Sequence, residues 1–168
     1  MSNAHPREPK GRGGDWTEER GTSDEGRSRR KGGPEASGEN RASGGRRLAF
    51  IGLGIMGGPM AANLVKAGFE VIGYNRSPAR TEQLVAAGGH GAKDIAKAVR
   101  EADVVATMVP DSPDVEEVLA GPGGVFENAP SGALIIDFSS IRPDVAAALA
   151  GHGAERGFRV LDAPVSGG

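Results

Sequence analysis

The stretch Phe50–Leu64, FIGLGIMGGPMAANL, places four glycines within seven residues, directly after an apolar run and directly before a segment typical of a helix. Glycine costs backbone entropy on folding, so a compensating interaction is expected here. Gly52, Gly54 and Gly57 follow the pattern G-x-G-x-x-G. The first glycine allows a tight turn, the second leaves room for a pyrophosphate, and the third lets helix and strand pack closely. The helix N-terminus then offers free N–H groups to the phosphates.

A glycine-rich turn without a ligand is the alternative for this stretch, because the chain holds 28 glycines. The context favours a dinucleotide-binding loop, since a second predicted strand, 69–76, ends about 20 residues further on, where such a fingerprint meets the adenosine ribose. An acidic residue there would accept a hydrogen bond from the 2′-hydroxyl of NAD, but the sequence has Asn75 and Arg76. An arginine can bind a 2′-phosphate through two N–H groups, which favours NADP. NAD stays open because an arginine can also stack on adenine, and an exposed loop cation without a ligand is the third interpretation.

Predicted strands and helices alternate along the rest of the chain. Strands are expected at 48–54, 69–76, 103–110, 133–140 and 158–168, and helices at 57–68, 77–89, 93–102, 112–121 and 142–157. Ser77 and Ser112, each followed by proline, are expected to cap their helices. The alternation predicts an α/β fold of the Rossmann type, a doubly wound parallel sheet with helices on both faces.

The composition excludes several classes of protein and site. The chain has 168 residues, a net charge of −2 and no cysteine, which rules out disulfides and cysteine-based zinc sites. Its three histidines are scattered without ligand spacing, so no metal site is expected. The charge gives no reason to expect nucleic acid or an anionic membrane as a partner. Without a long apolar run or a secretory signal, a cytoplasmic protein is the default expectation.

Residues 1–46 differ from the remainder in composition. Their only apolar residues are Met1, Ala4, Trp16, Ala36 and Ala42. Such a segment cannot bury enough surface to offset its ordering entropy, so we expect a disordered leader before the domain at 47–168. The cluster RSRRK at 27–31 could be a nucleic-acid or localisation patch, but a solvated charge run is the favoured interpretation. A start codon chosen too far upstream is a further alternative.

Four ordered segments resemble the β-hydroxyacid dehydrogenase family, which includes 3-hydroxyisobutyrate dehydrogenase and 2-hydroxy-3-oxopropionate reductase. They are the glycine-rich stretch with its following strand, TMVPDSPDVEEVLAGPGGV at 107–125, IIDFSSIRPD at 135–144 and VLDAPVSGG at 160–168. The resemblance implies an NAD(P)-dependent oxidoreductase that interconverts a small 3-hydroxy acid and its 3-oxo acid or semialdehyde. The last two segments are most similar to the 2-hydroxy-3-oxopropionate reductase branch. The family also implies a homo-oligomer, which is doubtful for a shortened chain.

The resemblance also implies roles for single residues. The backbone from Leu53 through Gly54, Ile55 and Met56 to Gly57 would hold the pyrophosphate, and Asn75 and Arg76 would meet the adenosine ribose. Further coenzyme contacts are expected from Gly52, Val109, Pro110, Asp114 and Ser140. Substrate contacts are expected from Ser139, Ser166, Gly167 and Gly168. The paired glycines that end the chain would expose successive N–H groups, which suits a substrate carboxylate.

The family's general acid is a lysine on a helix that begins just past the position of Gly168, and a helical second domain follows it. No lysine among the 168 residues matches that group, so we expect a shortened reductase with no catalytic residue of its own. A non-catalytic dinucleotide-binding module is the main alternative. A regulatory protein that recruits a partner through its basic leader is the third hypothesis.

Overall fold

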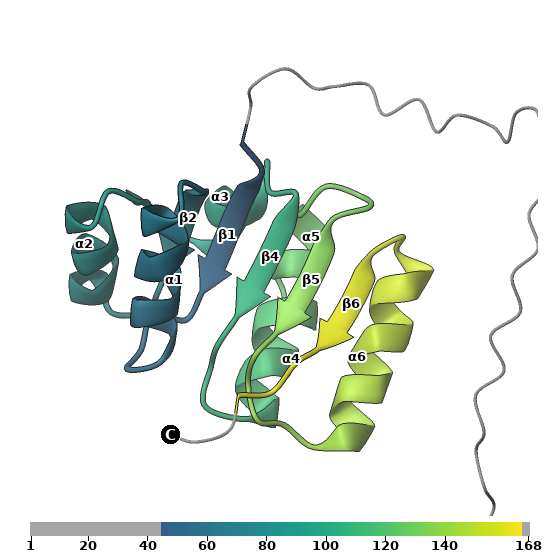
Figure 1. Cartoon of the computed structure of the whole chain (residues 1–168). Coiled ribbons are helices and arrows are strands. Elements are labelled where there is room, and N and C mark those ends of the chain that lie inside the picture. The colour runs from purple at the N-terminus through teal and green to yellow at the C-terminus, as the bar shows by residue number, and fades with distance from the viewer. Residues whose placement is uncertain (1–44, 166–168) are drawn as a thin grey trace, which may run out of the picture. The chain divides into compact units, whose positions relative to one another are not determined.

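The computed structural model describes residues 45–165, so most of the predicted leader and Ser166, Gly167 and Gly168 lie outside the described residues. Six strands form one sheet in the order β3-β2-β1-β4-β5-β6, and all neighbours pair in parallel (Figure 1). The strands are β1 (Arg47–Ile51), β2 (Glu70–Tyr74), β3 (His90–Gly91), β4 (Val104–Thr107), β5 (Leu134–Asp137) and β6 (Arg159–Asp162). From β1 the chain adds β2 and β3 on one side, and then returns to add β4, β5 and β6 on the other side of β1. This strand order is that of a Rossmann-like α/β fold. The predicted fold class is confirmed.

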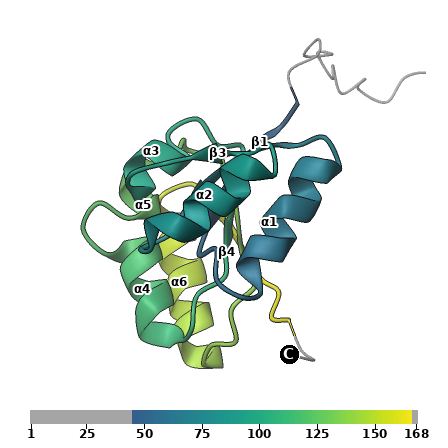
Figure 2. The ribbon, with the colours of Figure 1, turned by 90° about the vertical axis from the view of Figure 1, so that its left-hand side faces the viewer.

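The helices form a layer on each side of this sheet. They are α1 (Gly57–Lys66), α2 (Pro78–Ala86), α3 (Ile95–Val99), α4 (Ser112–Ala120), α5 (Val125–Asn128) and α6 (Pro143–Glu155). Figure 2 shows α1 on one side of the sheet and α4 and α6 on the other. No helix in the described range is long and apolar enough to cross a bilayer.

Strand β1 supplies side chains to both halves of the core, because successive residues of a strand point to opposite faces. Ala49 and Ile51 pack in the cluster beneath α3, α4, α5 and α6, whereas Leu48 and Phe50 pack in the cluster beneath α1 and α2. All four side chains are buried. The apolar run of the opening stretch is therefore the central strand of the fold, and it holds the glycine-rich loop that follows in a fixed position.

The helical cover of the sheet is uneven. On the face that α1 and α2 cover, no helix of the described residues lies over β5 and β6, as Figure 1 shows. Ile136 and Leu161 are register partners that point to this face, and Leu161 is 50% exposed. The expectation of helices on both faces thus holds for the half of the sheet around β1 and β2.

Local details of several elements differ from expectation. The short elements β3 and α5 were not predicted, because neither is long enough to show periodicity. Helix α3 covers only Ile95–Val99 of the expected 93–102, and it begins after Asp94, whose carboxylate accepts a hydrogen bond from the N–H of Lys97 at 2.7 Å. Helix α4 begins at Ser112, with Asp111 at the capping position. Ser77 occupies the capping position of α2, but its side chain makes no capping hydrogen bond.

Candidate functional site

A cavity of about 620 Å³ lies at the carboxyl ends of β1, β2 and β4, where the strand order reverses. In parallel α/β sheets this crevice is where ligands bind. All the residues expected to contact a coenzyme line it except Leu53. These lining residues are Gly52, Gly54, Ile55, Met56, Gly57, Asn75, Arg76, Val109, Pro110, Asp114 and Ser140. The structure thus brings together residues that are separated by up to about 90 positions in the sequence.

Two glycines of the fingerprint are required by close backbone contacts. Gly52 has a φ of +94°, and a Cβ atom there would overlap the carbonyl oxygen of Met108 on the neighbouring strand end. A Cβ atom on Gly57 would overlap the carbonyl oxygen of Gly52 and lie 3.1 Å from Cε1 of Phe50. These contacts confirm the tight turn and the close packing of helix against strand.

Gly54 is different from its two neighbours in the pattern. A Cβ atom there would meet no atom within 4 Å, and its φ is not positive, so the fold does not require glycine at this position. Gly54 lines the cavity, which is where the second glycine of the fingerprint leaves room for a pyrophosphate. The open space at Gly54 is therefore available to a ligand.

The loop also presents unused N–H groups. Within the described part of the chain, the amides of Gly54, Ile55, Met56 and Gly57 donate no hydrogen bond to another group of the protein. They precede or open α1, a helix of 10 residues, so the positive end of the helix dipole faces the same space. The side chain of Ile55 is 83% exposed at the rim. The loop is thus chemically suited to an anion, with an apolar residue beside it.

Asn75 ties the loop to the end of β2. Its Oδ1 accepts a hydrogen bond from the N–H of Leu53 at 2.9 Å, and its Nδ2 donates to the carbonyl oxygen of Ser77 at 3.3 Å. Leu53 itself is buried and does not line the cavity. The N–H of Leu53 is therefore engaged within the protein, which distinguishes Leu53 from the loop residues after it that are also expected to hold the pyrophosphate.

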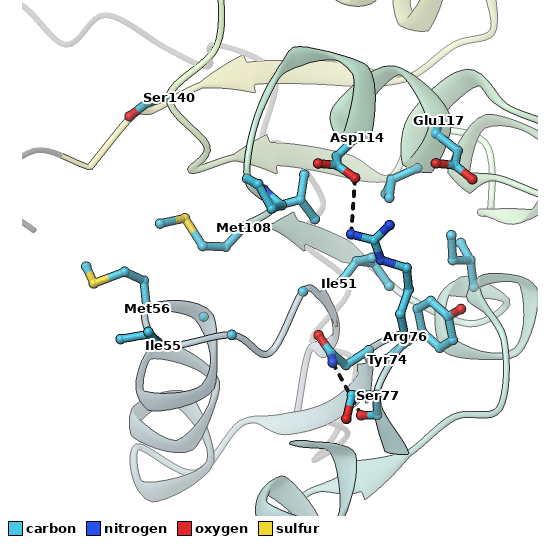
Figure 3. A pocket seen from close by; sticks show the side chains of 18 residues that line it. Ile51, Ile55, Met56, Tyr74, Arg76, Ser77, Met108, Asp114, Glu117 and Ser140 are labelled. Carbon is cyan, nitrogen blue, oxygen red and sulfur yellow. Dashed lines mark hydrogen bonds and ion pairs between the residues drawn. The ribbon is translucent and has the colours of Figure 1, made fainter. Parts of the chain in front are cut away.

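Arg76 and Asp114 come from opposite walls of the cavity and form an ion pair. Arg76 lies two residues after the end of β2, and Asp114 lies in the first turn of α4. Nη2 of Arg76 lies 3.2 Å from Oδ1 of Asp114, as the dashed line in Figure 3 marks. The arginine side chain is 76% exposed and the aspartate side chain 23%. The guanidinium is thus both accessible and already partnered.

A buried polar network holds the loop after β4 in place. Oγ1 of Thr107 donates to Oδ1 of Asp137 at 2.7 Å, and the same oxygen accepts from the N–H of Ser139 at 3.1 Å. The hydroxyl oxygen of Ser139 accepts from the N–H of Val109 at 3.0 Å. Because Val109 and Pro110 line the cavity, the network fixes one of its walls.

This network engages Ser139, for which a substrate contact is expected. The residue is fully buried and does not line the coenzyme cavity, and in this structure its side chain positions Val109. Its neighbour Ser140 is exposed and lines the cavity as expected. The described residues contain no cluster of three histidine, aspartate or glutamate side chains that could hold a metal ion.

Sequence reasoning missed a group of lining residues, most of which lie within the quoted motifs at positions to which no role was assigned. They are Ile51, Tyr74, Ser77, Ile95, Met108, Glu117 and Val118. Glu117 was detectable, because it lies three residues after Asp114 and therefore on the same face of a helix already assigned to the site. Ile95 gave no signal, because its position depends on how α3 packs against the sheet.

Comparison with known proteins identifies the family of the domain. Residues 47–168 match the family model described as the NAD binding domain of 6-phosphogluconate dehydrogenase. An NAD-dependent L-serine dehydrogenase of Pseudomonas aeruginosa is 42% identical over 123 residues, which cover 73% of this chain and 41% of that protein.

Solved structures agree with this assignment. Mycobacterium tuberculosis 3-hydroxyisobutyrate dehydrogenase with L-serine superposes with a TM-score of 0.70 and 39% identity, over 74% of this chain and 42% of that one. The protein Psf3 in complex with NADP+ and 2-OPP superposes with a TM-score of 0.68 and 31% identity, over 72% of this chain and 43% of that one. The chain thus spans about two fifths of the length of the relatives that it matches.

Proposed function

The chain belongs to the family of the NAD binding domain of 6-phosphogluconate dehydrogenase, and from this premise we propose that the cavity binds NAD(P) for a dehydrogenase that acts on small hydroxy acids. When bound, the nicotinamide coenzyme supplies or accepts the hydride. The chain's own residues bind and orient it. The 3-hydroxyisobutyrate and L-serine dehydrogenases among the relatives support this substrate class.

One observation carries the proposal: Gly54 stands in open space beside amides that have no partner in the described part of the chain. A pyrophosphate carries the negative charge that these N–H groups and the start of α1 attract. Close backbone contacts within the protein require glycine at Gly52 and Gly57, whereas no such contact requires it at Gly54. A requirement for ligand approach accounts for glycine at this position.

The adenosine end supports NADP as the preferred coenzyme. No acidic residue lies at the end of β2, and Arg76, which comes shortly after this strand, lines the cavity. A guanidinium can bind a 2′-phosphate, whereas an NAD site ordinarily has a carboxylate at this point. NAD binding is the alternative, and the L-serine dehydrogenase relative is named as NAD-dependent.

Among hydroxy acids, we propose the 3-hydroxy and 3-oxo acid pair, with 2-hydroxy-3-oxopropionate as the favoured substrate. The proposal rests on the resemblance of residues 135–144 and 160–168 to that branch of the family. Ser140 at the cavity rim and the terminal Ser166, Gly167 and Gly168 are the proposed contacts on the nicotinamide and substrate side. A dinucleotide-binding module is the second candidate, because the cavity accounts for coenzyme binding by itself.

Nucleotide titration of the full chain tests the coenzyme proposal. Binding of NADPH with higher affinity than NADH is expected by calorimetry or nicotinamide fluorescence. Gly54→Ala should lower the affinity for both roughly tenfold or more, because hydrogen bonds to a charged group are worth ~1.5–3 kcal/mol each. Gly151→Ala is the matched control, because Gly151 lies on α6, outside the cavity, and also faces open space. Equal binding by wild type and Gly54→Ala would refute the proposed loop function.

An activity assay tests whether the chain contains a proton donor. The purified chain should oxidise NADPH with 2-hydroxy-3-oxopropionate at no more than a trace rate, because general acid catalysis is worth ~10²–10⁴-fold and no candidate donor is identified among its residues. Turnover near the ~10 s⁻¹ typical of enzymes would show that a proton donor within these residues had been overlooked.

A further inference from the structure

The adenosine end of the cavity has an unusual balance of charge for a site that is to accept a 2′-phosphate. Arg76 supplies one positive charge, and Asp114 and Glu117 on α4 supply two negative charges among the described lining residues. Figure 3 shows both carboxylates on the helix that faces the guanidinium. A phosphate dianion entering this space is attracted by Arg76 and repelled by both acids.

The ion pair between Arg76 and Asp114 means that a 2′-phosphate and the Asp114 carboxylate compete for the same guanidinium. Nη2 of Arg76 lies 3.2 Å from Oδ1 of Asp114, and Asp114 is the less exposed partner, at 23%. A 2′-phosphate that binds Arg76 through two N–H groups has to displace this carboxylate or share the guanidinium with it. A ribose with a free 2′-hydroxyl makes no such demand, so NAD can bind while the pair stays intact.

We propose that Asp114 is a specificity-determining residue, which competes with the 2′-phosphate for Arg76 and thereby limits the preference of the site for NADP over NAD. This inference rests on the proposed function of the cavity. It assigns opposite effects to the two charged partners: Arg76 favours the 2′-phosphate and Asp114 opposes it. Asp114 acts through Arg76 and through its own charge, and it needs no contact with the reacting atoms.

The inference predicts a definite response to Asp114→Asn. The substitution keeps the shape of the side chain, removes one negative charge and releases Arg76. Loss of a weak, largely exposed ion pair and relief of the repulsion act in the same direction, so the affinity for a 2′-phosphate should rise roughly three- to tenfold. Affinity for the nucleotide that lacks this phosphate should change less than about twofold.

The closing experiment uses the full chain and two fragments that differ only in the 2′-phosphate, 5′-AMP and 2′,5′-ADP, with NADH and NADPH beside them. Calorimetry gives the four affinities for wild type, Asp114→Asn and Glu116→Gln. Glu116 is the matched control, because it is an exposed acid on the same helix that does not line the cavity. Glu116→Gln should leave all four affinities within about twofold of wild type.

A double-mutant cycle separates competition for Arg76 from a general change of charge. In an Arg76→Gln background, Asp114→Asn should raise the affinity for 2′,5′-ADP clearly less than it does in wild type. Equal gains in both backgrounds would overturn the competition. So would an unchanged or lower affinity of Asp114→Asn for 2′,5′-ADP, or a selective loss of 5′-AMP and NADH, which would show that Asp114 binds the ribose.

The two proposals fail in distinguishable ways. If wild type binds all four nucleotides and Asp114→Asn leaves their order and spacing unchanged, the role of Asp114 is refuted and the coenzyme site stands. If correctly folded wild type binds none of them, both are refuted. Circular dichroism of each variant confirms that the comparison is made between folded proteins.

Discussion

Gly57→Ala is the sharpest test of how the glycine-rich loop is built. The added Cβ atom would overlap the carbonyl oxygen of Gly52 and lie 3.1 Å from Cε1 of Phe50. Both groups belong to the central strand or its end, and Phe50 is fully buried, so neither can move away cheaply. The substitution therefore forces α1 away from β1.

The expected magnitude follows from two opposing terms. Alanine is favoured over glycine within a helix by up to ~1 kcal/mol. Inserting an atom into a well-packed core costs typically ~1–3 kcal/mol, and a clash with backbone lies at or above the upper end. We expect a net loss of about 1–3 kcal/mol in the free energy of unfolding, which corresponds to roughly 5–15 °C in Tm for a domain of this size.

Urea denaturation followed by circular dichroism measures the effect. Gly151→Ala on α6 is the control, because the same change there meets no atom within 4 Å and should raise stability by ~0.5–1 kcal/mol. If Gly57→Ala is as stable as wild type, or gains as much as Gly151→Ala, the close packing of α1 on the strand end is refuted.

Two further predictions concern polar contacts away from the glycines. Thr107→Val should lower the free energy of unfolding by ~1–3 kcal/mol in urea melts, because it removes a hydrogen bond of 2.7 Å to the buried carboxylate of Asp137, and an unchanged midpoint would contradict this. Two hydrogen bonds from Arg142 lower the pKa of Asp144, so the folded state holds its proton less tightly than the unfolded chain and the contribution to stability fades as the pH falls below about 4. Asp144→Asn should therefore reduce the urea midpoint slightly at pH 7 and less at pH 3; a larger deficit at pH 3 than at pH 7 would contradict the assignment.

The elements that local sequence determines were predictable. The run before Gly52 and the apolar positions after it gave β1 and α1, since a buried strand and an amphipathic helix each leave a periodic pattern. The short elements β3 and α5 left none. Helix α4 begins at Ser112 as expected, but the capping position belongs to Asp111 and not to Ser112. The hydroxyl of Ser112 accepts a hydrogen bond from the N–H of Arg142, 30 residues away, and local sequence does not encode such a partner.

In the site, too, local sequence predicted some features, whereas contacts between distant residues determined others. The fingerprint predicted which loop faces the cavity, and spacing predicted that Arg76 lies near it. Nothing in either pattern revealed that Asp114 pairs with Arg76, or that Ser139 turns inward to hold Val109. Both arrangements depend on how β4 and β5 are placed beside β1, and only the folded sheet sets that placement.

The glycines show how one motif serves fold and ligand through different atoms. A Cβ atom on Gly52 or Gly57 would overlap a carbonyl oxygen of the protein, so replacing either residue should lower the stability of the fold without any nucleotide present. A Cβ atom on Gly54 would meet no such group, so its replacement should lower only the affinity for the nucleotide. A variant's stability and its nucleotide affinity are therefore separate measurements of the same loop. If Gly54→Ala proves as destabilising as Gly57→Ala, all three glycines are required for packing, and the open space at Gly54 does not indicate a pyrophosphate site.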